Sequence, residues 1–263
     1  MAIRVGVFGA GGRMGATVCQ AVVDDPELEL VAAVDPQHAG LDLQEVTKCD
    51  VPGVQIARDP EGMGHADVEV AVDFTHVDAA RQNLAWLARN DIHAVVGTTG
   101  FTEADYDALG KSFTGSNCVI APNFAVGAVL MMRFAELAAP YFETGEVVEL
   151  HHDGKVDAPS GTAVLTVQRM AAASDQWGAD PTTEESLEGA RGAQGPNGIR
   201  VHAIRMRGMV ASQEVILGTT GQTLTIRHDT TDRTSFMPGV VLAVKRVADH
   251  PGLTVGLDSL LGL

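Results

Sequence analysis

The chain has 263 residues, 45% of them hydrophobic and 20% charged, so it is long and apolar enough to fold around a substantial core. Its 34 acidic residues against 18 basic ones give a net charge of −16, which repels nucleic-acid phosphates and anionic lipid headgroups. We therefore expect no nucleic-acid or membrane partner, and a small anionic ligand must meet a local cluster of positive groups.

Three cysteines, Cys19, Cys49 and Cys118, lie far apart and form no CxxC pair. Their spacing predicts neither a disulfide framework nor a metal site, and it is typical of proteins of the reducing cytosol. The first residues, 1–15, lack a basic region and a cleavage site, so we expect no targeting peptide. The most apolar stretch, residues 124–140, is interrupted by charged residues, and we expect a buried helix there rather than a membrane span.

In the first half of the chain, short apolar runs alternate with helical patterns. The runs predict strands at residues 3–8, 30–34, 68–74, 94–96 and 118–121, and helices at 14–23 and 79–88. This alternation is typical of βαβ units around a parallel sheet. Polar turn residues at 73–75 and 97–99 end two of these strands, and ligands bind at the carboxyl ends of strands in open α/β sheets.

The pattern changes after the helix at 124–140. Strand-like runs at 146–150, 201–207, 214–217 and 223–227 follow one another with turns between them, which predicts a mixed or antiparallel sheet in a second domain. Residues 174–198 predict a long loop, with mobility over a site as one interpretation. A helix is expected at 240–248, followed by a short apolar tail that returns to the first domain.

A glycine-rich run, Gly9-Ala10-Gly11-Gly12-Arg13-Met14-Gly15, directly follows the first predicted strand and opens a helix. Such glycines make a tight turn and let backbone N–H groups approach a pyrophosphate at a helix N-terminus. The spacing departs from G-x-G-x-x-G, but Asp35 ends the second predicted strand, where an acid accepts hydrogen bonds from ribose hydroxyls. The pattern predicts dinucleotide binding; the alternative is an ordinary glycine turn with Asp35 as a solvated turn residue.

A second constellation leads from a strand through a loop into a helix at residues 149–163. His151, His152 and Lys155 lie within five positions there, and Ser160 is a suitable N-cap for the helix that follows. Two imidazoles, an ammonium and the N–H groups of a helix start form the positive cluster that an acidic protein needs to hold carboxylates. Adjacent histidines of an extended chain point to opposite faces, so we expect these two to act differently.

The whole run, His151-His152-Asp153-Gly154-Lys155-Val156-Asp157-Ala158-Pro159-Ser160-Gly161-Thr162, closely resembles the signature of the dihydrodipicolinate reductase family, also called 4-hydroxy-tetrahydrodipicolinate reductase, of the bacterial diaminopimelate and lysine pathway. The resemblance covers the whole chain, through segments that keep the family's order: Gly9–Gly15, Asp73-Phe74-Thr75, Gly97-Thr98-Thr99, Ala121-Pro122-Asn123-Phe124 and the C-terminal helix. The histidine–lysine run is far more specific than the glycine loop.

The resemblance implies an NAD(P)H enzyme that delivers hydride to C4 of a cyclic dicarboxylate, with loss of the 4-hydroxyl as water, to give tetrahydrodipicolinate. It implies that His151 donates or accepts a proton and that Lys155 donates one, with no metal involved. The substrate contacts that we expect are His152, Ser160, Gly161 and Thr162.

The same resemblance assigns cofactor binding to residues at the ends of the parallel strands: Gly9, Ala10, Gly11, Gly12, Arg13, Met14, Asp35, Phe74, Thr75, Gly97, Thr98, Thr99, Ala121, Pro122, Asn123 and Phe124. Asp35 should repel the 2′-phosphate of NADPH, and no arginine follows it. Arg13 partly offsets that repulsion, so we expect both NADH and NADPH to be accepted, with a preference for NADH.

We therefore expect an α/β protein with a Rossmann-type parallel-sheet cofactor domain at residues 1–123 plus 236–263. A second α+β domain of mixed sheet, residues 124–235, is expected to bind the substrate and to form oligomers. The resemblance implies a homotetramer built through this sheet. It also implies a protein of the cytoplasm. Two alternatives stay open: a dehydrogenase for another small anionic substrate, and a non-catalytic module that binds a dinucleotide without turnover. The intact histidine–lysine set argues against the second.

Overall fold

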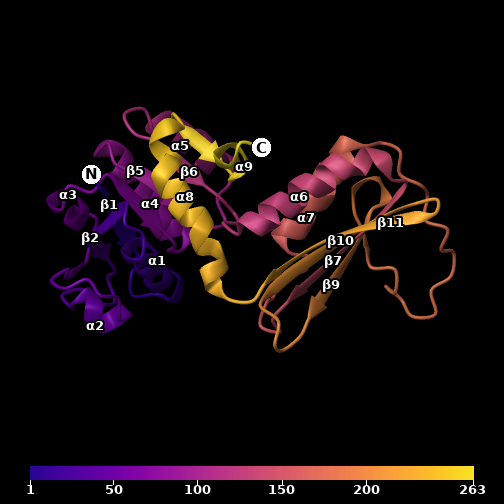
Figure 1. The fold of residues 1–263 in the computed structure, drawn as a ribbon, viewed down its shortest axis with the longest axis horizontal. Coiled ribbons are helices and arrows are strands. Elements are labelled where there is room, and N and C mark those ends of the chain that lie inside the picture. The colour runs from indigo at the N-terminus through magenta and orange to yellow at the C-terminus, as the bar shows by residue number, and fades with distance from the viewer. The chain divides into compact units, whose positions relative to one another are not determined.

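The computed structural model describes residues 1–263, which form two compact units (Figure 1). Unit 1 comprises Met1–Phe124 and Phe236–Leu263, and unit 2 comprises Ala125–Ser235. Each unit has its own sheet and its own covering helices. The cofactor-binding and substrate-binding roles expected for the two parts of the chain stay predictions.

Unit 1 is built on a seven-stranded sheet in which all neighbouring strands are parallel, in the order β12-β6-β5-β4-β1-β2-β3. Its strands are β1 (Ile3–Phe8), β2 (Leu28–Val34), β3 (Ile56–Ala57), β4 (Val70–Asp73), β5 (His93–Val96), β6 (Cys118–Ile120) and β12 (Leu253–Val255). Parallel strands need crossover connections, and helices supply most of them here. The predicted Rossmann-type sheet is confirmed, and the C-terminal tail returns to it as β12.

Helices cover both faces of this sheet. They are α1 (Arg13–Val23), α2 (Leu43–Thr47), α3 (Glu61–His65), α4 (Val77–Arg89), α5 (Glu103–Ser112), α8 (Met237–Arg246) and α9 (Asp258–Leu261). Successive strand residues point to opposite faces. Ala94 and Val96 of β5 pack in one core cluster with Leu84 of α4 and Leu109 of α5, while Val95 between them is equally buried on the other face.

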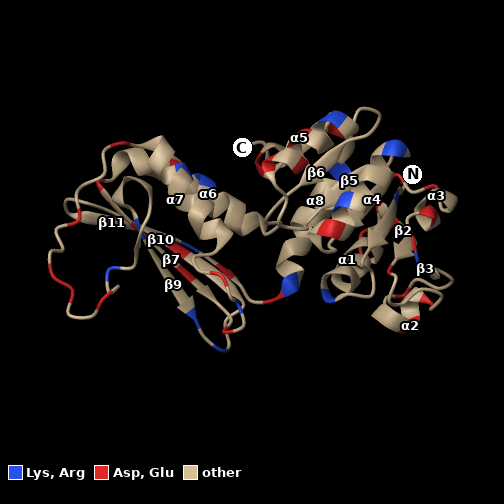
Figure 2. Cartoon of the chain, turned by 180° about the vertical axis from the view of Figure 1, so that it is seen from behind, with Lys and Arg blue, Asp and Glu red and all other residues tan.

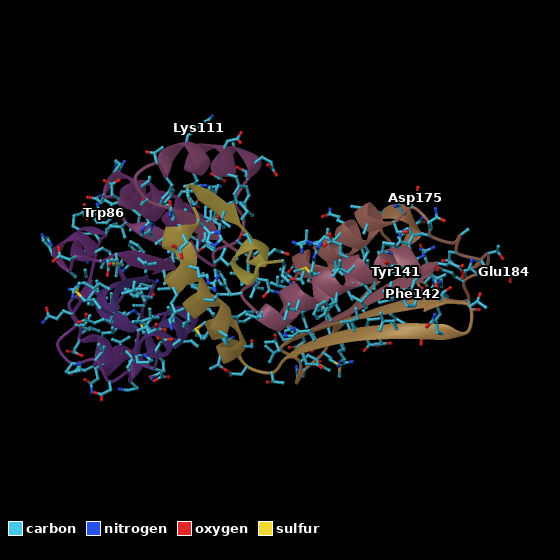
Figure 3. All side chains as sticks on the ribbon, turned by 45° about the horizontal axis from the view of Figure 1, so that its top comes forward. Trp86, Lys111, Tyr141, Phe142, Asp175 and Glu184 are labelled. Carbon is cyan, nitrogen blue, oxygen red and sulfur yellow. The ribbon has the colours of Figure 1, made fainter.

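Several short elements of unit 1 have no clear apolar pattern, and the sequence analysis missed them: α2, α3, α5 and β3. Helix α5 buries only Leu109, so it lacks the apolar stripe that marks a core helix, and Lys111 lies on its exposed side (Figure 3). Polar contacts hold it instead. Thr102 and Asp105 form a capping box at its start, and Arg81 of α4 donates two hydrogen bonds of 2.8 Å to Asp105.

Unit 2 has a five-stranded mixed sheet in the order β11-β10-β7-β9-β8, in which only β7 and β9 are parallel. Its strands are β7 (Thr144–His151), β8 (Ala193–Gln194), β9 (Arg200–Arg205), β10 (Ala211–Thr219) and β11 (Gln222–Thr230). Helices α6 (Val126–Ala138) and α7 (Gly161–Ala173) pack together over the sheet (Figure 1). The predicted mixed sheet is confirmed, and none of the helices in the structure has the length and hydropathy needed to cross a bilayer.

The predicted loop at 174–198 contains little regular structure, but ion pairs tie it to the sheet. Arg191 donates to Glu146 of β7 at 2.7 Å and lies 3.2 Å from Asp180, to which Arg200 of β9 also donates at 2.9 Å. Its charged residues are mostly acidic (Figure 2). Two exposed ones, Asp175 and Glu184, are labelled in Figure 3.

Candidate active site

The glycine loop of unit 1 is a tight turn between β1 and α1. Gly9 adopts a positive φ of 68°, its N–H donates to the Val34 carbonyl at 2.8 Å, and its own carbonyl accepts the Gly12 N–H at 2.9 Å. A Cβ on Gly15 would lie 2.0 Å from that carbonyl oxygen, so only glycine allows this close approach of helix to turn. The loop therefore presents the N-terminus of α1 at the carboxyl ends of the strands, the arrangement that binds a pyrophosphate.

Asp35 lies directly beyond β2 and is turned toward this loop. Only 7% of it is exposed; Oδ2 accepts the Gly11 N–H at 3.0 Å and Oδ1 accepts the Gln37 N–H at 2.9 Å. Each carboxylate oxygen can accept a second hydrogen bond, so both retain capacity for ribose hydroxyls. The structure also brings His38 to this site, with Nδ1 3.3 Å from Asp35 Oδ2, a contact that the sequence analysis did not anticipate.

A buried carboxylate, Asp73, joins the ends of β4 and β5. It is fully buried, and its Oδ1 accepts hydrogen bonds from the Thr75 N–H at 2.8 Å and from the Thr75 hydroxyl at 2.7 Å. The Thr98 hydroxyl lies 3.2 Å from the same oxygen, and Asn83 donates to Oδ2 at 2.8 Å. Asp73 thus fixes two of the three threonines predicted to contact the cofactor, Thr75 and Thr98, although the sequence analysis gave it no role of its own.

A partly apolar pocket lies at the same edge of unit 1. Its lining brings together residues from the ends of several elements: Met14, Phe74, Gly97, Ala121, Pro122, Asn123, Phe124 and Phe236. The rings of Phe74 and Phe124 are 5.7 Å apart. All of these except Phe236 are predicted cofactor residues, whereas Arg13 and Thr99 are exposed and are not part of the lining. Phe236 follows 111 residues after Ala125, beyond all of unit 2, so nothing in its local pattern indicates this position.

In unit 2 the histidine–lysine segment, residues 149–163, is organised by a carboxylate to which the sequence analysis assigned no role. Glu149 of β7 has no exposed side-chain surface, and Arg205 of β9 donates Nη1 to its Oε2 at 2.9 Å and Nη2 to its Oε1 at 2.8 Å. The Ser160 N–H donates to Oε1 at 3.1 Å. Burial alone would raise the pKa of Glu149, but the hydrogen bonds from Arg205 and His151 outweigh it, so its pKa lies below the ordinary value.

His151 ends β7 on the same face as Glu149, and its Nδ1 lies 2.5 Å from Glu149 Oε2. Burial lowers the pKa of His151 more than the carboxylate raises it, and the nearby charges of Lys155 and Arg205 lower it further. With a pKa below the ordinary 6.5, the neutral imidazole is the predominant form at pH 7. His152, by contrast, is exposed in the loop, so the two histidines have different surroundings; their different roles stay a prediction.

Lys155 also has a partner. Its Nζ lies 2.8 Å from both carboxylate oxygens of Asp157, whose pKa is lowered mainly by this contact. The sequence predicted a cluster of net positive charge here, but the structure pairs each cation with an acid. The Lys155 ammonium is balanced by Asp157, and the Arg205 guanidinium is balanced by Glu149. The Lys155–Asp157 pair is partly exposed, and such a pair contributes little energy, so an incoming carboxylate can compete for the ammonium.

Helix α7 begins directly after this loop. Ser160 is its N-cap: the hydroxyl accepts the Ala163 N–H at 3.3 Å and the residue is only 4% exposed. Gly161 and Thr162 form the first turn, and Gly161 is exposed with open space where a side chain would lie. The predicted substrate contacts therefore stand at a helix N-terminus suited to a carboxylate, with Ser160 serving as its cap.

Comparison with known proteins finds the same family along nearly the whole chain. Residues 3–124 match the family described as dihydrodipicolinate reductase, N-terminus, and residues 127–261 match dihydrodipicolinate reductase, C-terminus. The 4-hydroxy-tetrahydrodipicolinate reductase of Beutenbergia cavernae is 52% identical over 100% of both chains, and that of Corynebacterium urealyticum is 49% identical over 99% of both.

Among solved structures, a dipicolinate-bound dihydrodipicolinate reductase from Paenisporosarcina sp. TG-14 superimposes with a TM-score of 0.86 at 37% identity, covering 98% of this chain and 99% of that one. An amine dehydrogenase from Mycobacterium smegmatis, at 13% identity and a TM-score of 0.66, shares the fold alone. The chain therefore belongs to the dihydrodipicolinate reductase family, and it is an NAD(P)H-dependent oxidoreductase with the 4-hydroxy-tetrahydrodipicolinate reductase function of that family.

Proposed function

We propose that unit 1 holds NAD(P)H and that the loop after β7 in unit 2 supplies the acid–base groups that reduce 4-hydroxy-tetrahydrodipicolinate to tetrahydrodipicolinate. The observation that carries this proposal is the placement of His151 and Lys155 directly before the N-terminus of α7, beside a buried carboxylate that holds His151. The Paenisporosarcina relative is described as dipicolinate-bound, which supports a small cyclic dicarboxylate as the ligand.

The residues of unit 1 fit a nicotinamide dinucleotide. The turn at Gly9 and the start of α1 would hold the pyrophosphate, Asp35 the adenosine ribose, and the pocket beside Phe74 the nicotinamide. When bound, the cofactor supplies the hydride that enters the substrate ring at C4.

The chain itself supplies the proton and the charge that the reaction needs. Replacing the 4-hydroxyl by hydride, with loss of water, takes up one proton, and an ammonium group such as that of Lys155 can donate it. We assign the proton donation to Lys155, which must leave Asp157 to reach the substrate. Neutral His151, with Nδ1 directed at Glu149, has its other ring nitrogen available to accept or relay a proton.

Substrate binding is assigned to the start of α7. The backbone N–H groups of Gly161 and Thr162 would bind one substrate carboxylate, with His152 as a further contact. Ser160 belongs to the same predicted set; its hydroxyl caps the helix, so we expect it to act chiefly by fixing the first turn.

We further propose a modest preference for NADH over NADPH. The carboxylate of Asp35 faces the position of the adenosine ribose and would repel a 2′-phosphate, whereas exposed Arg13 offsets only part of that repulsion. The preference would lie between a few-fold and tens-fold, roughly 1–2 kcal/mol.

We also propose a homotetramer assembled through the sheet of unit 2, working in the cytoplasm. Partly exposed apolar side chains on and beside β9, β10 and β11 support an interface there: Ile204, Met206, Val210 and Leu224. The three cysteines are unpaired and buried, as suits a reducing compartment. Light scattering would measure the mass of the assembly.

The decisive experiment follows the oxidation of NADH and NADPH with and without the product of dihydrodipicolinate synthase, the preceding enzyme of the pathway. That product is generated in situ by adding the synthase. Oxidation that depends on this product is expected. Turnover with other small carbonyl acids but not with the synthase product would overturn the proposed substrate.

A further inference from the structure

Glu149 has an unusual set of partners for a residue with no assigned role. It is completely buried on the central strand β7, and its two oxygens accept four hydrogen-bond donors. Oε1 accepts from Arg205 and from the Ser160 N–H; Oε2 accepts from Arg205 and faces His151 Nδ1. Because residues two apart on a strand point to the same face, β7 itself places Glu149 beneath His151.

These contacts determine which ring nitrogen of His151 carries hydrogen. The guanidinium of Arg205 and the backbone N–H of Ser160 can only donate, and a buried carboxyl group that meets these three donors, two of them from a charged bidentate arginine, favours its ionised form. An ionised carboxylate has no hydrogen to offer, and His151 Nδ1 must therefore be the donor in their contact. In the neutral ring the lone pair then lies on Nε2.

We propose that Glu149, held in place by Arg205, is a positioning residue that fixes His151 as the Nδ1–H tautomer and so makes Nε2 a hydrogen-bond acceptor for the substrate. The tautomer follows from the contacts alone, and its catalytic meaning rests on the function proposed above. Ser160 extends the effect, since the same carboxylate anchors the N-cap of α7. One buried charge thereby orients the proton-handling residue and the first turn of the predicted carboxylate site.

The substitution Glu149→Gln has a specific expected consequence. Glutamine keeps one oxygen and replaces the other with an NH2 group. With its oxygen at the Oε1 position, glutamine still accepts from Arg205 Nη2 and from the Ser160 N–H, and its NH2 group meets one other donor, Arg205 Nη1. The reverse orientation would set the NH2 group against two donors, so the first is favoured. The NH2 group then faces His151 Nδ1, which can satisfy it only as an acceptor. The variant should therefore carry the opposite tautomer, with hydrogen on Nε2.

Nitrogen-15 NMR of the histidine ring nitrogens tests this directly, with His151→Gln to assign the resonances. In the unsubstituted protein at pH 7.5 to 8, we expect His151 to show a protonated Nδ1 and an unprotonated Nε2; in Glu149→Gln we expect the reverse. A protonated Nε2 in the unsubstituted protein would overturn the proposal without any need for the variant to fold.

Kinetics supply the second test. The charged groups that face His151 are Glu149 on its own strand, Arg205 on β9 and Lys155 in the loop. For Glu149→Gln we expect kcat to fall about 10- to 100-fold, as for carboxylates that orient metal-binding histidines, with a smaller change in the KM for NADH. The acid limb of the pH profile of kcat/KM, where protonation of His151 reduces activity, should also move to lower pH. The reason is that the carboxylate that favours the imidazolium form of His151 is gone. Glu149→Asp, which keeps the charge, should recover part of kcat.

Strand β7 contains a matched control. Glu146 also pairs with one arginine and one histidine, Arg191 and His202, both at 2.7 Å, but it lies three residues away and so on the opposite face. Glu146→Gln should lower thermal stability while leaving kcat and the acid limb unchanged. Equal effects of the two substitutions on kcat, or an unmoved acid limb in Glu149→Gln, would show that Glu149 is only structural.

The two proposals fail in different ways. If the tautomer reverses as expected but the unsubstituted protein does not consume the synthase product, the proposed function is wrong and the orienting contact stands. If the protein reduces that product while His151 has the Nε2–H tautomer, the function stands and the positioning role is wrong.

Discussion

Gly161, the first residue of α7, provides a sharp test of the predicted carboxylate site. Its φ is not in the left-handed region, and a Cβ built on it meets no other atom within 4 Å. Neither backbone conformation nor packing within the chain therefore requires glycine there. A ligand that approaches the backbone closely would explain it.

The substitution Gly161→Ala should separate stability from binding. Alanine is favoured over glycine in a helix by up to about 1 kcal/mol, so Tm should be unchanged or up to about 3 °C higher. The added methyl group would occupy the space through which a carboxylate reaches the N–H groups. Losing one hydrogen bond to a charged group costs about 1.5–3 kcal/mol, which corresponds to a roughly 10- to 100-fold rise in the KM for the dicarboxylate.

Calorimetry with pyridine-2,6-dicarboxylate in the presence of saturating NADH measures this affinity, and steady-state kinetics measures the KM. The matched control is Gly110→Ala in α5 of unit 1, because a Cβ there also meets nothing within 4 Å. It should give the same stability change with no change in dicarboxylate affinity. An unaltered Kd in Gly161→Ala would refute the assignment of the α7 N-terminus as the carboxylate site.

Three further predictions address the acid–base groups and the cofactor loops. Lys155→Met and His151→Gln should each lower kcat about 10²- to 10⁴-fold while the Kd for NADH, measured by fluorescence titration, stays nearly constant. Asp73→Asn keeps one acceptor oxygen for the two loop threonines and the Asn83 amide, which use both oxygens of Asp73, so it should loosen this edge, weaken NADH binding about 5- to 50-fold in the same titration and leave dicarboxylate contacts intact. The pKa of Glu149 is lowered from 4.5 on folding, so the unfolded chain binds more protons below that pH and stability should fall as the solution is acidified from pH 4.5; Glu149→Gln should show a shallower loss in denaturant titrations over the same range.

Local patterns predicted the parts of the molecule whose chemistry is contiguous in sequence. The glycine loop follows β1, and the histidine–lysine run leads directly into α7, so strand, turn and helix signals identify both. The same reasoning predicted a parallel sheet in the first half and a mixed sheet in the second. The positions where elements begin and end were less accurate: α8 begins at Met237, ahead of the predicted 240–248, because Pro238 occupies its first turn.

The contacts that organise each site depend on which strands become neighbours, and local patterns do not contain that information. Glu149 and Arg205 are 56 residues apart and meet only because β7 and β9 pair in parallel, with His151 opposite Arg205. Phe236 reaches the pocket of unit 1 after the chain has passed through all of unit 2. The sequence signal that could have indicated these anchoring roles is an acid within or at the end of an apolar strand run, Glu149 in β7 and Asp73 in β4, because an acid in a buried strand needs a partner.

Asp35 provides the test of cofactor preference. Its carboxylate accepts N–H groups from Gly11 and Gln37, so Asp35→Asn, which has only one acceptor oxygen, must leave one of them poorly paired. That loss disturbs the loop for either cofactor and cancels in the ratio of their kcat/KM values, whereas the removed negative charge affects only the 2′-phosphate of NADPH. We therefore expect the unsubstituted enzyme to favour NADH by a few-fold to tens-fold, and Asp35→Asn to move the ratio toward NADPH by a similar factor, roughly 1–2 kcal/mol.

Arg13→Gln should move this ratio the opposite way, toward NADH, because Arg13 is an exposed cation of the same loop. A clear preference of the unsubstituted enzyme for NADPH would mean that Arg13, or His38 at 3.3 Å from the carboxylate, outweighs Asp35, and the role given to Asp35 would be wrong.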